Sequence, residues 1–380
     1  MKDRSRRIFL SPPVLTGKEE KYIRTALASR YLAPLGPEVV KFEREVGEII
    51  GGKICVALST GTAAIHLALL LAGVGVGDRV LVSDLTFISS AAPILYVGAR
   101  PVFIDSAPKS WNMDIGLVEK YLERCGKPRP KALILVHLFG QPADINRAQA
   151  VCEYYRMELI EDAAGALGAT YGNQPVGGIG RLGVLSFNGN KIVTTSSGGM
   201  LVCQDATDAA RARFLAGMAK EPGPGYVHLE LGYSYGLSNI CAAIGRAQLK
   251  ALPERLRQKR ALAVRYRELL TDVNWLEFLP EPTWGKGNEW LTCVLFGPDI
   301  IKGAQRQKRV HEALVAENIE APPIWRPMHA QPLFADYEYV CGETGSISEE
   351  LWRQGLCLPS GAGLNNADLE RVCRIIQRSM

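Results

Sequence analysis

The sequence predicts an α/β protein in which helices flank a mostly parallel central sheet, followed by a smaller C-terminal α/β domain. Two observations lead to this fold class. Between about residues 50 and 205, short apolar runs alternate with stretches whose apolar residues recur at helical spacing. After residue 232 the alternation stops, and two helical patterns precede a mixture of short strands and helices. Near-continuous apolar strands between helices are typical of parallel sheets that are covered on both faces.

The expected elements follow from these patterns in chain order. Strands are expected at 53–58, 78–84, 100–105, 131–139, 157–162 and 198–205, and the helices between them at 62–73, 87–98, 115–126 and 145–156. Helices at 238–252 and 253–273 should meet at Pro253, because proline interrupts a helix. The last part should hold a strand at 289–296 and helices at 305–318 and 366–380. We place the large domain at residues 1–255 and the small domain at 256–380.

Composition narrows the class of protein. The 380 residues include 44 Lys and Arg against 39 Asp and Glu, an excess too small for a dedicated nucleic-acid binder but compatible with an anionic small ligand. The nine cysteines are scattered singly, which indicates reduced thiols in the cytoplasm. No apolar run is long enough for a membrane span or a signal peptide. We expect a cytoplasmic protein that binds neither membranes nor nucleic acid.

Three segments lie where a parallel sheet presents its ligands, beyond the carboxyl ends of strands. In the first, Gly61 and Thr62 open a helix whose unpaired N–H groups can bind a phosphate. An ordinary Ser or Thr helix cap is the alternative explanation of that segment. In the second, an apolar strand ends at Glu161 and Asp162. A buried carboxylate there needs hydrogen bonds or a cation, and capping of a helix is the alternative role.

The third segment is SFNGNKIVTTSSGGM, residues 186–200, where Lys191 is the single charged residue. A solvated surface loop is the simpler interpretation, since lysines are seldom buried. However, an activated amine can form a Schiff base with a carbonyl cofactor. A phosphate site, an acid at a strand end and a lysine on one sheet are together what pyridoxal 5′-phosphate requires. We therefore expect this cofactor.

Two other kinds of site are not supported by the sequence. The histidines and cysteines are not spaced as metal ligands, so no metal site is predicted. The G-x-G-x-x-G match at residues 178–183 precedes a strand instead of joining a strand to a helix, so we reject it as a dinucleotide site. His66 lies within an apolar helical pattern and is expected to be a buried core residue.

The quoted segments, together with FLSPP, YLAPLG, LTFISSAAPI, PVFID, KALILVHLFG, IWRPMHAQ and CLPSG, resemble the DegT-type nucleotide-sugar aminotransferases along essentially the whole chain. The resemblance implies the fold type I of pyridoxal phosphate-dependent transferases, that of aspartate aminotransferase. Within the family, the likeness is closest to the aminotransferase of the UDP-N-acetylbacillosamine pathway. The implied reaction converts a 4-keto-6-deoxy nucleotide sugar, UDP-linked and N-acetylated, to its 4-amino form with L-glutamate as donor. The implied assembly is a homodimer with shared active sites.

The resemblance also implies residue roles. Lys191 would carry the cofactor and transfer protons, and Asp162 would pair with the pyridinium nitrogen. The phosphate would be held by Gly61, Thr62 and Ser186, and Phe87 would stack on the ring. The sugar-nucleotide pocket would be lined by Tyr31, Asn188, Ser234 and His329, although an interdomain histidine with no substrate contact is an equal alternative for His329.

The sequence departs from the family pattern in three places. The residue three positions after the aspartate, usually Glu, His or Gln, is Gly165. The family's G-Y-N-Y-R is here G-Y-S-Y-G at 232–236, so that Ser234 and Gly236 replace an asparagine and an arginine. Two further interpretations therefore stay open: a different keto-sugar aminotransferase such as a GDP-perosamine synthase, and a catalytically silent paralogue that only binds the cofactor or a sugar nucleotide.

Overall fold

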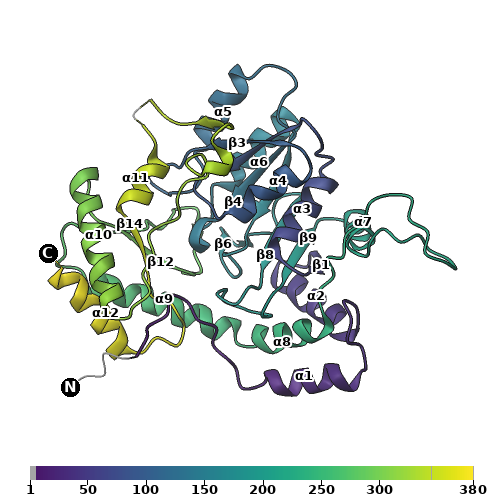
Figure 1. Ribbon diagram of the computed structural model, residues 1–380, viewed down its shortest axis with the longest axis horizontal. Helices are drawn as coiled ribbons and strands as arrows, with labels where there is room; N and C mark the ends of the chain where they lie inside the picture. The colour runs from purple at the N-terminus through teal and green to yellow at the C-terminus, as the bar shows by residue number, and fades with distance from the viewer. Residues whose placement is uncertain (1–5, 344, 380) are drawn as a thin grey trace.

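A computed structural model describes residues 6–343 and 345–379. Its central sheet has eight strands in the order β1-β9-β8-β5-β4-β2-β3-β13 (Figure 1). The strands are β1 (Ile54–Leu58), β2 (Arg79–Ser83), β3 (Arg100–Ile104), β4 (Ala132–Val136), β5 (Glu158–Asp162), β8 (Leu182–Ser186), β9 (Gly199–Cys203) and β13 (Glu338–Val340). Strand β9 runs antiparallel to β1 and β8, and the pairs from β8 to β13 are parallel. The predicted mostly parallel sheet is confirmed.

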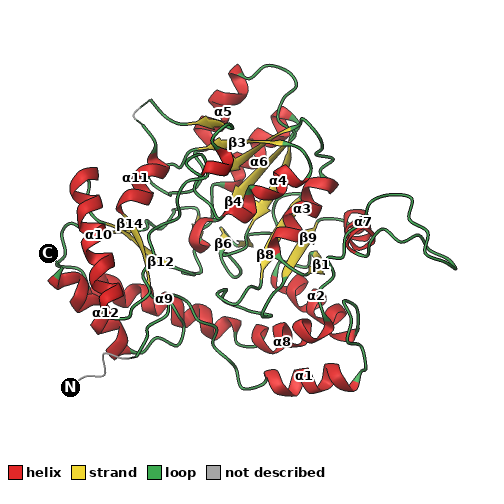
Figure 2. Ribbon diagram, in the orientation of Figure 1, coloured by secondary structure: helices red, strands yellow, loops and turns green. Residues whose placement is uncertain are grey.

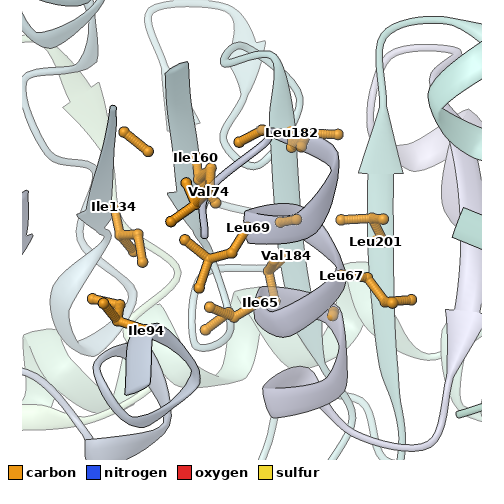
Figure 3. Packing of buried hydrophobic residues seen from close by; sticks show 14 of the residues in the cluster. Ile65, Leu67, Leu69, Val74, Ile94, Ile134, Ile160, Leu182, Val184 and Leu201 are labelled. Atoms are coloured by element: carbon orange, nitrogen blue, oxygen red, sulfur yellow. The ribbon is translucent and has the colours of Figure 1, made fainter. Parts of the chain in front are cut away.

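Helices cover this sheet, as the alternating pattern predicts. They are α3 (Gly61–Leu71), α4 (Ala92–Tyr96), α5 (Ile115–Arg124), α6 (Ile145–Tyr155) and α7 (Ala206–Ala216). Helix α3 is buried from Ala63 to Leu69. Figure 3 shows its Ile65 and Leu69 packed towards Ile134 and Ile160 of the sheet. Burying one such side chain contributes about 1.5–3 kcal/mol, so this contact holds the start of α3 at the edge where β1 ends.

The expected helix at 87–98 is wrong as a single element. The chain forms a short 3-10 turn at Ile88–Ser90 and then begins α4 at Ala92. Pro93 lies in the first turn of α4, where its missing N–H costs nothing. The break falls at Ala91, whose backbone lies between the two elements with φ −102° and ψ −40°.

Four helices lie along the lower side of the molecule in Figure 1: α1 (Glu19–Ala28), α2 (Pro37–Ile49), α8 (Asn239–Leu249) and α9 (Leu252–Leu269). The last two confirm the predicted pair, and Pro253 lies in the first turn of α9. Helix α9 runs through residue 255 without a break, so the division into domains at that residue stays a prediction.

The C-terminal part forms a second, smaller α/β unit (Figure 2). Its sheet contains β10 (Glu277–Phe278), β12 (Thr292–Leu295) and β14 (Gly355–Leu358), flanked by α10 (Ile300–Ala316), α11 (Ile347–Gln354) and α12 (Asn366–Arg378). A further small sheet joins β11 (Gly285–Lys286) to β6 (Thr170–Tyr171) and β7 (Gln174–Pro175). The N-terminal segment also reaches the small unit, where Ile8 N–H donates to the carbonyl of Asn318. No helix among the described residues is long and apolar enough to cross a membrane.

Candidate active site

A cavity of about 300 Å³ lies at the carboxyl ends of the central strands. Seven of the ten predicted site residues line it, namely Gly61, Thr62, Phe87, Asp162, Ser186, Asn188 and Lys191. They come from segments that are far apart in the sequence, and the parallel sheet brings them together.

One end of the cavity is formed by the first turn of α3. The side chain of Thr60 caps this helix by accepting a hydrogen bond from the Ala63 N–H at 3.0 Å. The N–H groups of Gly61 and Thr62, at the first two helical positions, have no acceptor within the helix. Ser186 at the end of β8 lies beside them, because a Cβ on Gly61 would be 3.3 Å from its Cβ. A helix cap and an anion site therefore coexist here.

Asp162 ends β5 with a side chain that is 5% exposed. Its Oδ2 accepts a hydrogen bond from the Ser90 hydroxyl at 2.6 Å, and its Oδ1 accepts one from the Ala164 N–H at 3.0 Å. The Ser90 hydroxyl lies 2.6 Å from that of Thr86. These bonds hold a carboxylate at the cavity wall in one orientation. Sequence reasoning missed Ser90, whose segment reads as an ordinary apolar helix.

The neighbouring Glu161 does not line the cavity and instead stabilises the fold through hydrogen bonds. Its carboxylate accepts backbone N–H bonds from Gly177, Ile179 and Gly180 at 2.6–2.7 Å. It also lies 2.9 Å from His137 Nε2, whose other ring nitrogen accepts the Ala143 N–H. The glycine-rich segment at 177–180 is thus a carboxylate cradle that precedes β8, which agrees with its rejection as a dinucleotide site.

Lys191 is partly buried and lines the cavity. Its Nζ lies 3.6 Å from the centre of the Trp290 ring. Burial lowers the pKa of the amine to about 8, although the negative charge of Asp162 opposes that shift. About a tenth of the amine is therefore neutral at pH 7, far more than for an ordinary lysine, and the neutral form is the one that a nucleophile or base requires.

The model of the DegT/DnrJ/EryC1/StrS aminotransferase family matches residues 13–377. The chain belongs to this family. It is 43% identical over 374 residues to EpsN of Bacillus subtilis strain 168, a candidate pyridoxal phosphate-dependent aminotransferase, and the match covers 98% of this chain and 95% of the relative. It is 35% identical over 367 residues to a GDP-perosamine synthase of Caulobacter vibrioides, with 96% of each chain covered. A solved structure of a family aminotransferase from Brucella abortus matches with a TM-score of 0.87 and 29% identity over 95% of each chain.

Enzymes of the DegT/DnrJ/EryC1/StrS family are pyridoxal phosphate-dependent sugar aminotransferases, which confirms the predicted fold, enzyme class and cofactor. The cavity fits this cofactor. It offers free N–H groups for a phosphate, a buried carboxylate for a pyridinium nitrogen and an amine of lowered pKa for an aldehyde.

Aromatic side chains line the rest of the cavity. Phe87 is 55% exposed, whereas a phenylalanine in an apolar helix is usually buried in the core. Its ring centre lies 5.7 Å from that of Trp325, which in turn lies 4.8 Å from Phe139 and 6.2 Å from Trp290. Sequence reasoning missed both tryptophans, because they come from segments more than 90 residues beyond Lys191.

Three predicted substrate residues lie outside the cavity wall of the single chain. Tyr31 is 49% exposed beyond α1, and Ser234 is exposed in the segment after residue 231. His329 has both ring nitrogens engaged, by Asp84 at 2.7 Å and Glu349 at 3.2 Å, and its ring stacks on Tyr339 at 3.8 Å. Substrate contacts by these three side chains stay predictions.

The departures from the family pattern have structural counterparts. A Cβ at Gly165 would lie 2.5 Å from the Trp290 ring, and one at Gly236 would lie 2.8 Å from the Pro34 side chain. A side chain at either position would require those neighbours to shift. His66 is 4% exposed and contacts the Tyr235 hydroxyl at 3.0 Å, which confirms it as a buried residue.

Proposed function

We propose that this enzyme converts a UDP-linked, N-acetylated 4-keto-6-deoxy sugar to its 4-amino form, with L-glutamate as amino donor. The observation that carries the proposal is the joint placement of Lys191, Asp162 and the start of α3 on one cavity. The choice of UDP and an N-acetylated sugar rests on the resemblance of the quoted segments to the bacillosamine branch of the family.

The roles of the residues follow from their surroundings. The first-turn N–H groups of α3 and the Ser186 hydroxyl would hold the cofactor phosphate. The bound cofactor supplies an electron sink. Asp162, oriented by Ser90, would pair with a protonated pyridine nitrogen of the cofactor. Lys191 takes a proton from one carbon and returns it to another, a task suited to an amine whose pKa is about 8.

A second candidate is amination of a GDP-linked 4-keto-6-deoxy sugar. It is favoured by the 35% identity to a GDP-perosamine synthase across 96% of the chain. Both candidates use the same residues around the cofactor and differ only in the nucleotide and in the substituent at C2 of the sugar.

We also propose a homodimer whose active sites are shared. Support comes from residues 217–231, which we call the arm: a loop that follows α7 and projects from the body of the chain in Figures 1 and 2. It exposes large apolar side chains, with Tyr226 at 85%, Leu229 at 79% and Leu231 at 75%. Ser234 lies three residues beyond the arm and pairs with Gly217 at its base, so a second copy that covers the arm would also lie close to Ser234.

An amination assay tests the substrate. The purified enzyme is given L-glutamate and, in separate reactions, UDP-linked N-acetylated, GDP-linked and dTDP-linked 4-keto-6-deoxy sugars, and the amino sugars are measured by mass spectrometry. The proposal predicts a kcat/KM at least about 100-fold higher for the UDP-linked substrate, equivalent to about 2.7 kcal/mol of discrimination. A preference for the GDP-linked sugar would instead establish the second candidate.

A further inference from the structure

The backbone conformation at position 165 does not require a glycine. Its φ lies outside the left-handed region where glycine is favoured. The requirement comes from Trp290, since an added Cβ would lie 2.5 Å from Cε3 and 2.8 Å from Cζ3 of the indole. A side chain at position 165 and an indole at position 290 therefore compete for the same space in the cavity wall.

The position of Trp290 is held by hydrogen bonds at each of its polar groups. Its backbone N–H donates to Asn288 Oδ1 at 2.9 Å, and its carbonyl accepts from the buried Lys259 amine at 3.0 Å. The Asn288 amide also donates to the carbonyls of Gly165 and Leu167, so that the two competing segments are tied together. With 3% of its surface exposed and these bonds in place, Trp290 forms a buried part of the cavity wall.

The indole contacts the Lys191 segment at two points. The Lys191 amine lies over the ring face at 3.6 Å from its centre, and the indole N–H donates to the carbonyl of Asn190 at 2.9 Å. One side chain thus orients both the amine and the backbone immediately before it. A protonated amine is attracted to the face of a tryptophan ring, most strongly where water is excluded.

We propose that Trp290 is a positioning residue for Lys191, held in place because position 165 is glycine, and that the Gly165–Trp290 pair acts as one unit in the catalytic site. The inference deepens the proposed function and rests on Lys191 being the amine that carries the cofactor. The other titratable side chains that line the described cavity are Asp162 and His137, and both stay unchanged in the experiments below.

The first test weakens the electrostatic attraction between the Trp290 ring face and the protonated amine of Lys191 while the indole is kept. Trp290 is replaced by mono-, di- and tetrafluorotryptophan, and the apoprotein is labelled with a trace of an amine-reactive reagent across a pH series. The extent of labelling at Lys191 is read by peptide mass spectrometry. Because fluorine withdraws charge from the ring face, the labelling midpoint should fall stepwise, by up to about 1 pH unit for the tetrafluorinated ring.

Trp284 provides the matched control. Its indole N–H also donates to a backbone carbonyl, that of Pro142 at 3.1 Å, but it does not line the cavity. The same fluorinated series at position 284 should leave the Lys191 midpoint unchanged. A midpoint that does not move with fluorination at position 290 overturns the proposal, whichever lysine carries the cofactor.

The second test asks whether the pair acts as a unit. Gly165→Ala should displace the indole and change the Lys191 midpoint in the parent protein. In a Trp290→Leu background, which lacks the ring atoms that the new Cβ would meet, the same change should have no further effect. Equal effects of Gly165→Ala in the two backgrounds contradict the coupling. If Gly165→Ala does not fold, the fluorinated series, which leaves position 165 as glycine, still decides the role of Trp290.

Discussion

The cavity around Lys191 and the arm at residues 217–231 differ in whether their side chains have partners within the chain. In the cavity, Asp162 is buried with a defined partner for each oxygen, and the amine of Lys191 is oriented by Trp290. The arm is tied to α7 by the Arg211–Glu230 ion pair and closed by the bond from Glu221 N–H to the Val227 carbonyl, but it exposes its largest apolar side chains. One chain therefore supplies the oriented carboxylate and amine of the site, whereas the apolar side chains of the arm stay exposed to solvent in the single chain.

The largest expected effect comes from breaking the cavity. Lys191→Ala removes the amine that bears the cofactor and transfers the proton, so kcat/KM for amination should fall by at least about 10³-fold. The assay is formation of the amino sugar, with Lys120→Ala on the exposed face of α5 as control. Retention of more than a tenth of the activity would contradict the role given to Lys191.

Breaking the arm should have the next largest effect. The double change Leu229→Asp and Leu231→Asp places charges where a second copy is proposed to bind. Each leucine that the change removes from the proposed interface takes away about 1.5–3 kcal/mol of burial free energy from dimer formation. The dimer dissociation constant should therefore rise by at least about 100-fold. Light scattering on a dilution series measures it. Val76→Asp, which changes an isolated apolar side chain that is 91% exposed, is the control and should leave association unchanged.

A smaller change sharpens the description of the cavity. Ser90→Ala removes one of the two hydrogen bonds to the Asp162 carboxylate. Hydrogen bonds to charged groups contribute about 1.5–3 kcal/mol, and a water can replace part of that, so we expect kcat/KM to fall on the order of tenfold. Ser29→Ala removes a hydroxyl that donates at the same 2.6 Å to a carbonyl at the end of α1. An equal loss in both variants would refute a specific role for Ser90.

The smallest expected effect concerns the His329 cluster, which lies outside both regions. Asp84 and Glu349 raise the pKa of His329 above its ordinary 6.5 despite its burial, and burial raises the pKa of Asp84 despite the histidine. A histidine of raised pKa stabilises the fold fully below its unfolded pKa and loses this contribution as pH rises through the folded pKa. The stability difference between the parent and His329→Gln should therefore be about 1 kcal/mol larger at pH 6 than at pH 9. Urea denaturation measures it, and a difference independent of pH would refute the charged pair.

The site residues that could be predicted from the sequence are those placed by a short local pattern. Gly61 and Asp162 each stand at the end of a predicted strand, and the sheet places those ends at one edge. Strand β8 (Leu182–Ser186), which leads to Lys191, is not among the predicted strand ranges. Trp290, Ser90 and the partners of Glu161 could not be predicted, since each depends on contacts between segments far apart in the chain. For Trp290, the signal was an unexpected Gly165, which by itself does not reveal which side chain takes the vacant space.

The most direct measurement is the site of covalent attachment of the cofactor. The holoenzyme is reduced with borohydride, digested and mapped by mass spectrometry. Two lysines of lowered pKa compete for the label. Lys191 has a pKa of about 8 and lines the cavity, whereas Lys259 has a pKa of about 7 and its amine donates to the carbonyls of Trp290 and Ser360. Our account predicts the label on the peptide that contains Lys191. A label on Lys259, or on any other lysine, would contradict it.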